Sequence, residues 1–459
     1  MGTLTTFWRA EELPRRPRVI AFVVLVGVAI SRSPYLLLHG RFYAEEGRLY
    51  FAHMRDGSIW FIARPVGYIY AFVNVSTWFA ARISLERAPL VTAWLAFGVV
   101  AAIIWAALSW PSDLLPNAGS RVAAATLLVV SPMAVPAVWL NTTNVQVYFG
   151  VLALLLLFVG VTRMGRAGFV VAAILLAIAG LSGVYAAMLA PLFVLRAFRE
   201  RSRRMILLAS VISLCALAQV IVVTQHLGSG HLAENTGHFR GFAVTTRDVA
   251  GRQVTTFLFG NTIASGLQAR AFSGFKLLAF GFCAVVVVAV LVAAVASVAR
   301  RGVAVRLVLA LLLIEVLVLF GTHGRLAAGR YVVVPIAILV LMAVHGTNSP
   351  NRFGAGLAAA ACAVTFVAGI ATFWTRQPAT LRCVRCPEWQ QEVRAWRAGT
   401  SEVLVIWPYD TGVRWVIRLP KDQTPAAAAR PDGSDTAMRA PPDGGTSAAA
   451  RPPMAAASS

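Results

Sequence analysis

Charged residues are scarce in this chain. Only 13% of its 459 residues are charged, whereas 58% are hydrophobic and the mean hydropathy is +0.72. A typical soluble domain carries about 25% charged residues. A soluble fold with this composition would lack a water-facing exterior, which excludes soluble enzymes and disordered proteins. Apolar runs of about 20 residues recur along most of the chain and predict an all-α polytopic membrane protein.

Cysteine is also rare. Five cysteines are too few for a disulfide framework, and Cys215, Cys283 and Cys362 lie in apolar runs as small core residues. Cys383 and Cys386 form a single Cys-x-x-Cys pair. One such pair cannot complete a four-thiolate zinc site, so a local disulfide is the favoured interpretation.

The basic excess has a membrane explanation. The net charge is +22, from 41 basic and 19 acidic residues, which in a soluble protein would indicate nucleic-acid binding. Here the basic residues cluster in short loops, as the positive-inside rule requires of cytoplasmic loops, so no nucleic-acid partner is expected. Only Lys276 and Lys421 are lysines, which together with abundant Ala, Val and Gly indicates a high-GC bacterial genome. We therefore predict a multi-pass protein of the bacterial inner membrane with a cytoplasmic N-terminus.

The hydropathy pattern divides the chain into four parts. We predict a cytoplasmic N-terminus, a transmembrane domain, a small extracytoplasmic cap and a disordered tail, over 1–18, 19–374, 375–420 and 421–459. The transmembrane domain contains a first outer loop at 39–87 and a second large outer loop at 226–272. The cap carries four tryptophans, which would anchor it at the membrane interface or contact an acceptor sugar.

The basic loops decide the number of spans. If 64–83 lies on the membrane as an outer juxtamembrane helix, the arginine-rich loops all face the cytoplasm. This gives about eleven transmembrane helices, at 19–38, 88–110, 122–140, 145–162, 168–180, 184–197, 205–225, 274–299, 304–322, 331–345 and 354–374. The short spans at 168–180 and 184–197 are separated by Leu181-Ser182-Gly183. A helix break at membrane depth is tolerated where the backbone lines a cavity or packs on protein, so we expect a crevice that opens outward.

The most informative motif follows the first span. It reads Tyr43-Ala-Glu45-Glu46-Gly-Arg48 and is followed by Arg64-Pro65-Val-Gly67-Tyr68. Adjacent carboxylates beside the bilayer are costly unless they act in chemistry. The alternative is a solvated start to the loop with ordinary Glu–Arg pairs.

The order of these motifs resembles the GT-C superfamily of membrane glycosyltransferases, especially the aminoarabinose transferases of lipid A and the protein mannosyltransferases. These enzymes use polyprenyl-phosphate sugars and carry an acidic pair soon after the first span, then a basic-Pro segment leading into a juxtamembrane helix. Gly329-Arg330-Tyr331 followed by Pro335 resembles the start of a late span in the family. The resemblance covers about residues 1–345. It departs at Asn141 and Asn144, where the family often places a second acidic residue.

The resemblance implies roles for individual residues. Glu45 would be the catalytic base, and Glu46 its helper or the ligand of a divalent metal, if a metal takes part. Arg64, Arg330 and Tyr68 would bind the lipid phosphate, because a guanidinium donates parallel hydrogen bonds to phosphate and stays charged. Snorkelling at a helix end is the alternative for both arginines. Asn144 would be a secondary site residue.

Two other groups of polar residues remain open. Glu315 lies within the span 304–322, where a carboxylate is functional by default or pairs with an arginine of another helix. His226, His231 and His238 lie in the second outer loop, where their spacing is typical of an ordinary polar loop and does not specify a metal site.

The predicted function is transfer of a sugar from a polyprenyl-phosphate donor to a cell-envelope glycan, lipid or protein on the extracytoplasmic face. No Walker loop or Gly-rich phosphate turn is present in the sequence, which agrees with a donor other than a nucleotide sugar. Two alternatives stand beside this one. A transporter or flippase of lipid-linked sugars would share the helix breaks, and a non-catalytic membrane subunit would explain the missing second acid.

Overall fold

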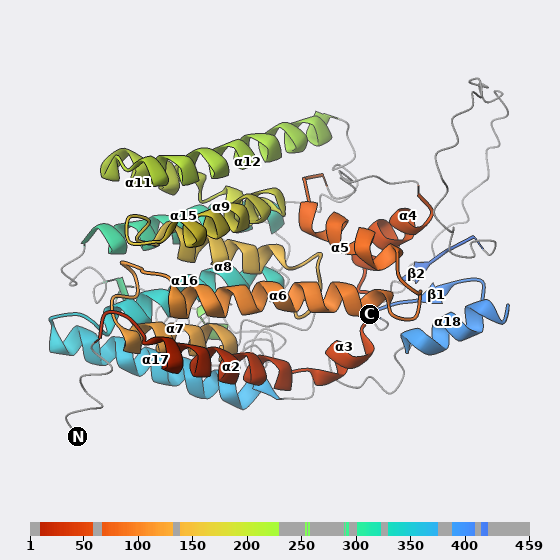
Figure 1. Cartoon of the computed structure of the whole chain (residues 1–459), viewed down its shortest axis with the longest axis horizontal. Coiled ribbons are helices and arrows are strands. Elements are labelled where there is room, and N and C mark those ends of the chain that lie inside the picture. Colours follow the sequence, from red (N-terminus) through yellow and green to blue (C-terminus); the bar gives the residue numbers. More distant parts are fainter. Residues whose placement is uncertain are drawn as a thin grey trace, which may run out of the picture. The chain divides into compact units, whose positions relative to one another are not determined.

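Helices make up most of the described structure (Figure 1). The computed structural model describes residues 10–57, 67–131, 138–228, 301–322, 329–374, 388–408 and 415–420, and a few positions between 253 and 292. The predicted disulfide pair and the tail 421–459 lie outside the described residues. So do His231 and His238 and most of the predicted span 274–299. The mostly helical architecture agrees with the predicted fold class.

Among the described residues, three helices are long and apolar enough to cross a membrane. They are α6 (Ala88–Ser109), the Arg203–Gln225 stretch of α12 (Arg203–Gly228) and α17 (Arg352–Phe373). Twenty-two residues rise roughly 33 Å, which matches the hydrocarbon core of a bilayer. Large apolar side chains of α12 and α17 are exposed, among them Leu214 and Val367 at 66% each. Such exposure fits lipid rather than water, so these helices are consistent with a membrane protein, while the count of eleven spans remains a prediction.

The centre of the helical body is formed by α16 (Val333–Gly346) and α8 (Gln146–Leu157). Every residue of α16 is buried, and so are all residues of α8 except its first. A helix that is apolar on all sides is stable in a protein core or in lipid, and here neighbouring helices cover it. α16 packs against α7 (Ala118–Val130), α8, α15 (Arg301–Thr322) and α17. These buried helices provide the rigid support from which the polar segments at both ends project.

The predicted spans 19–38 and 184–197 are each divided into two helices. The first apolar run forms α2 (Arg15–Ser31) and then the short α3 (Pro34–His39). The predicted break at Leu181-Ser182-Gly183 is confirmed, since α9 (Arg166–Leu181) ends there and α10 (Val184–Ala187) begins after it, followed by α11 (Ala190–Glu200).

The segment predicted to lie on the membrane contains a short helix. This helix, α5 (Ala71–Ala81), has 11 residues, which is too short to cross a bilayer. It packs against α6 and against the π-helix η1 (Glu46–Phe51), which continues into α4 (Ala52–Arg55). The position of α5 beside the acidic pair fits the predicted juxtamembrane role.

The described part of the cap packs on the first outer loop. It consists of α18 (Trp389–Arg397) and a two-stranded antiparallel sheet of β1 (Leu404–Val405) and β2 (Val416–Ile417). The Trp389 indole donates to the Leu85 carbonyl at 2.7 Å, and Arg397 pairs with Glu86 at 2.6 Å. Both contacts tie the cap to the turn before α6.

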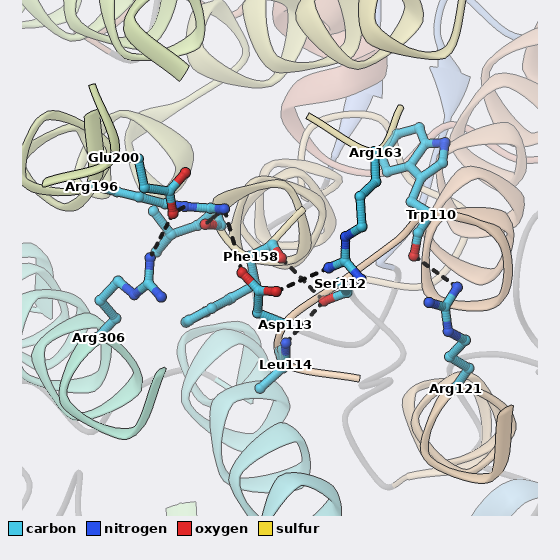
Figure 2. A network of polar contacts seen from close by, with 11 residues as sticks. Trp110, Ser112, Asp113, Leu114, Arg121, Phe158, Arg163, Arg196, Glu200 and Arg306 are labelled. Carbon is cyan, nitrogen blue, oxygen red and sulfur yellow. Dashed lines mark hydrogen bonds and ion pairs between the residues drawn. The ribbon is translucent and has the colours of Figure 1, made fainter. Parts of the chain in front are cut away.

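An ionic network joins several loops that the charge pattern assigned to the cytoplasm (Figure 2). Arg196, which is only 2% exposed, pairs with Glu200 at 2.6 Å and with Asp113 at 3.6 Å, and it also donates to the Leu157 carbonyl. Asp113 pairs with Arg163 at 2.9 Å, and Arg306 approaches Glu200 at 3.8 Å. The loops 111–121, 163–167 and 198–204 therefore gather at one end, as a shared membrane side requires.

Candidate functional site

The acidic pair lies on an unusual backbone. Ala44, directly before it, has a left-handed φ of 46°, although an alanine is strained there by roughly 1 kcal/mol or more. The Ala44 N–H donates to the Trp407 carbonyl of the cap, and the Trp407 N–H donates to Phe42. The π-helix η1 starts at Glu46. Strain and π-helices both recur at functional sites, and here they separate two neighbouring glutamates into different surroundings.

Glu46 is fully buried and joins two outer segments. Its Oε1 accepts hydrogen bonds from the Thr142 backbone N–H at 2.9 Å and from the Thr142 hydroxyl, and its Oε2 accepts from the Tyr43 N–H at 3.3 Å. Burial raises the pKa of Glu46, against the opposing effect of these hydrogen bonds and of the nearby Arg41. Glu46 therefore acts as a structural link from the first outer loop to the polar segment 141–144.

Thr142 was not found by sequence reasoning. It lies between Asn141 and Asn144, whose amides attracted attention because the family often has an acid there. The segment begins after Leu140, which has a left-handed φ of 55°, and the Asn141 side chain accepts from the backbone and hydroxyl of Thr143. The partner of the Thr142 hydroxyl, Glu46, lies 96 residues away in the chain. No local sequence pattern could therefore identify Thr142 as a site residue.

Glu45 is half-buried and faces a different set of groups. No hydrogen bond to its carboxylate is formed within the described residues. It lies close enough to Arg330 and to the Tyr43 and Tyr50 hydroxyls for its charge to act on them. Glu45 thus has no fixed hydrogen-bond partner among the described residues, while its neighbour Glu46 is held in place.

Arg330 lies in η3 (Gly329–Val332), the short 3-10 helix directly before α16. Its guanidinium donates to the Asn144 amide oxygen at 3.3 Å and to the Tyr331 hydroxyl at 3.4 Å, and it lies over the Tyr331 ring at 5.2 Å. An asparagine orients the guanidinium without neutralising it. Arg330 therefore keeps its full positive charge beside Glu45.

Tyrosines line the remainder of this site. The Tyr68 hydroxyl accepts from Gln146 at 3.0 Å, and the Tyr68 ring lies 5.2 Å from that of Tyr70. Burial raises the pKa of Tyr68, so its hydroxyl remains protonated at neutral pH and can donate a hydrogen bond. Tyr68 also lies near enough to Arg330 to interact with its charge. Two of the other predicted site residues, Glu45 and Tyr68, thus lie within electrostatic range of Arg330.

The helix break at Ser182 contacts the segment that carries these tyrosines. Tyr70 forms an antiparallel bridge to Ser182, and the Ser182 hydroxyl accepts from the Phe72 N–H at 3.1 Å. Gln219 of α12 exchanges hydrogen bonds with the Ile69 peptide at 2.9 and 3.0 Å and donates to the Gly180 carbonyl at 3.1 Å. Backbone groups released by the break are therefore bound by protein, as membrane depth requires.

Gly183 should not tolerate a side chain. Its φ is +125°, and a Cβ there would lie 2.5 Å from the Gln146 side-chain oxygen. We expect Gly183→Ala to lower the free energy of unfolding by on the order of 2 kcal/mol. Thermal unfolding in detergent measures this. Gly98→Ala in α6 is the matched control, since a Cβ there meets nothing within 4 Å. The control should leave the Tm unchanged or raise it, and an equal loss in both variants would contradict the assignment.

The other predicted residues are placed as follows. Arg64 lies in 58–66, outside the described residues, so its role as a phosphate clamp stays a prediction. Glu315 in α15 accepts from Gln253 at 3.1 Å, rather than pairing with an arginine within the part of the chain that is described. Tyr185 lies within electrostatic range of both Glu315 and Arg330.

The described residues do not fit a divalent metal. Both Glu46 oxygens already accept hydrogen bonds, and no group of three His, Cys, Asp or Glu residues gathers anywhere in the described ranges. A divalent metal at this site therefore stays a prediction, and Arg330 is a described cation that could compensate the negative charge of a ligand.

Comparisons with known proteins do not assign the chain to a family. No protein-family model matches it, and no curated protein matches it significantly. Any functional conclusion must therefore rest on the chemistry of the site itself.

Proposed function

We propose that the protein is a membrane glycosyltransferase that moves a sugar from a polyprenyl-phosphate donor to a cell-envelope acceptor on the extracytoplasmic face. One observation carries this proposal. Glu45, a carboxylate without a hydrogen-bond partner in the described structure, lies within electrostatic range of Arg330, whose guanidinium forms no ion pair among the described residues. A base and a phosphate-binding cation are the two groups that such a transfer needs.

The reaction assigns one role to each group. Glu45 accepts the proton of the acceptor hydroxyl as its oxygen attacks the anomeric carbon. The bond between that carbon and the phosphate oxygen breaks, and the electron pair leaves with the lipid phosphate. Arg330 stabilises the charge that grows on this phosphate, with Tyr68 as a neutral donor and Arg64 as a predicted second cation. Direct displacement by one base inverts the anomeric configuration.

Asn144 fits this proposal better than an acid would. A carboxylate in its place would pair with Arg330 across the present 3.3 Å contact and compete with the donor phosphate. We expect Asn144→Asp to weaken binding of a polyprenyl-phosphate sugar by roughly tenfold, equivalent to about 1.4 kcal/mol. Asn141→Asp is the control, because Asn141 contacts Thr143 instead. Equal donor affinity of Asn144→Asp and wild type, measured by titration in nanodiscs, would contradict the role of Arg330.

One reconstitution separates the candidate functions. The purified protein is placed in liposomes that hold a panel of polyprenyl-phosphate sugars, with envelope extract as acceptor and with or without EDTA. A glycosyltransferase releases free polyprenyl phosphate and moves the sugar to the acceptor. A flippase moves the sugar across the bilayer still attached to its lipid, which a membrane-impermeant probe of the sugar detects. A non-catalytic subunit does neither, and either of the last two results would overturn the proposal.

A further inference from the structure

A groove lies between α11 and α12, at the end of the molecule opposite to the candidate site's outer segments in the predicted topology. Its volume is about 410 Å³. It is lined by Val194, Ala197, Phe198, Arg201, Ile206, Ala209, Ser210 and Ser213. These are positions i, i+3, i+4 and i+7 of each helical stretch, so one continuous face of each helix forms a wall.

The walls of the groove are apolar and uncovered. Phe198 is 76% exposed, and Val194 and Ile206 are about half exposed. Ser210 and Ser213 are the polar members of the α12 wall. In a helix pair beside a bilayer, such a face is the natural neighbour of an acyl chain.

Exposed arginines without acidic partners lie around the turn between α11 and α12, and one of them, Arg201, lines the groove. Arg199, Arg201 and Arg203 are exposed, and none forms a hydrogen bond or ion pair within the described structure. The nearby carboxylate of Glu200 is already bound by Arg196 and Arg306. Arg204 is occupied too, because it donates to the Val161 and Met164 carbonyls. Three arginines thus remain available to an anion.

The backbone at Arg201 adds an independent observation. Arg201 caps α11 with a left-handed φ of 49°, a conformation that glycine adopts without strain. An arginine at this position costs stability, and it is the one arginine that lines the groove. Backbone strain retained at a residue that lines a groove is a pattern that recurs at functional sites.

We propose that this groove binds one anionic phospholipid of the cytoplasmic leaflet, with an acyl chain between α11 and α12 and the headgroup phosphate at Arg201. Basic residues between membrane helices on the cytoplasmic side bind anionic headgroups in this way. The apolar walls account for the chain and the unpaired arginines for the charge. The site is independent of the proposed transferase activity.

Native mass spectrometry of the delipidated full chain tests this site. We expect wild type to retain phosphatidylglycerol more tightly than phosphatidylcholine, and Arg201→Gly to reduce phosphatidylglycerol binding by about fivefold. Arg201→Gly should also unfold at the same or a higher temperature in lipid-free detergent, because glycine relieves the strained φ. Ser210→Trp, which fills the groove, should lower the binding of both lipids.

The control and the contrary results are equally specific. Arg352→Gln removes an exposed arginine at the start of α17, outside the groove, and should bind phosphatidylglycerol as wild type does. Equal retention of the two lipids by wild type, or equal losses in Arg201→Gly and Arg352→Gln, would overturn the proposal. So would full competition by glycerol phosphate, since this would indicate a phosphate site that does not use the acyl chain.

Discussion

Glu45→Gln should lower sugar transfer by about 10²- to 10⁴-fold, the usual contribution of a general base. The glutamine keeps the size of the side chain but cannot accept the acceptor proton. Donor affinity should stay the same or increase, because the change removes the negative charge beside Arg330. Thermal unfolding should not change, since no hydrogen bond to the Glu45 carboxylate exists in the described structure. Release of polyprenyl phosphate under single-turnover conditions, together with donor titration, measures all three.

A second glutamate of the outer region provides the control. Glu402 lies in the cap, is exposed and makes no contact with the candidate site in the described residues. Glu402→Gln should transfer sugar at the wild-type rate. If Glu45→Gln also retained wild-type turnover while Arg330→Gln lost it, the base would have to be another group. A loss of folding in Glu45→Gln would equally contradict its assignment as an unbonded carboxylate.

Glu46→Ala should instead destabilise the protein. It leaves the Thr142 N–H and hydroxyl and the Tyr43 N–H without their acceptor in a buried place. Each unsatisfied buried donor costs about 1–3 kcal/mol, so we expect an overall loss on the order of 3 kcal/mol. A fall in Tm of about 3 °C should follow in detergent. A Tm equal to that of wild type would show that Glu46 does not join the two outer segments.

The pH dependence of the Tm separates the effect of the Glu46 proton on stability from the effect of the size of the Glu46 side chain. Burial raises the pKa of Glu46 in the folded protein, whereas the unfolded chain ionises at the ordinary value. The folded state therefore holds this proton to higher pH, and its stabilising contribution is lost as pH rises through the folded pKa. Glu46→Gln has no proton to lose. The Tm of wild type minus that of Glu46→Gln should decrease from pH 4 to pH 8, and a constant difference would contradict this.

Residue patterns could locate the acidic pair, but only the resemblance assigned different roles to its two members. Glu45 and Glu46 are identical in type and adjacent, so composition and hydropathy treat them alike. Their separation depends on the left-handed Ala44 and on the π-helix that follows. Neither has a sequence signature, because an alanine at that φ is held there by tertiary contacts such as the bond to Trp407.

The arrangement of the loops was more accessible to prediction. Arginine-rich loops share a membrane side for electrostatic reasons, and Asp113, Arg163 and Glu200 do gather in one network. The break at Ser182 could also be predicted, because Ser-Gly within an apolar run interrupts helix formation. What binds the released backbone could not, since Gln219 is a single polar residue inside an otherwise apolar helix and lies 150 residues from Ile69.

Gln219 also has a consequence for the order in which the chain is built. It holds the peptide of Ile69 and the carbonyl of Gly180 together, and both positions are synthesised before α12. Until α12 is in place, the Gly180 carbonyl at the helix break lacks its hydrogen bond from Gln219. The segment with Tyr68 and Tyr70 then also lacks its bond at Ile69. The candidate site therefore assembles late in biosynthesis, so we expect a ribosome stalled before residue 219 to hold the earlier helices without the complete group of Glu45, Tyr68 and Arg330.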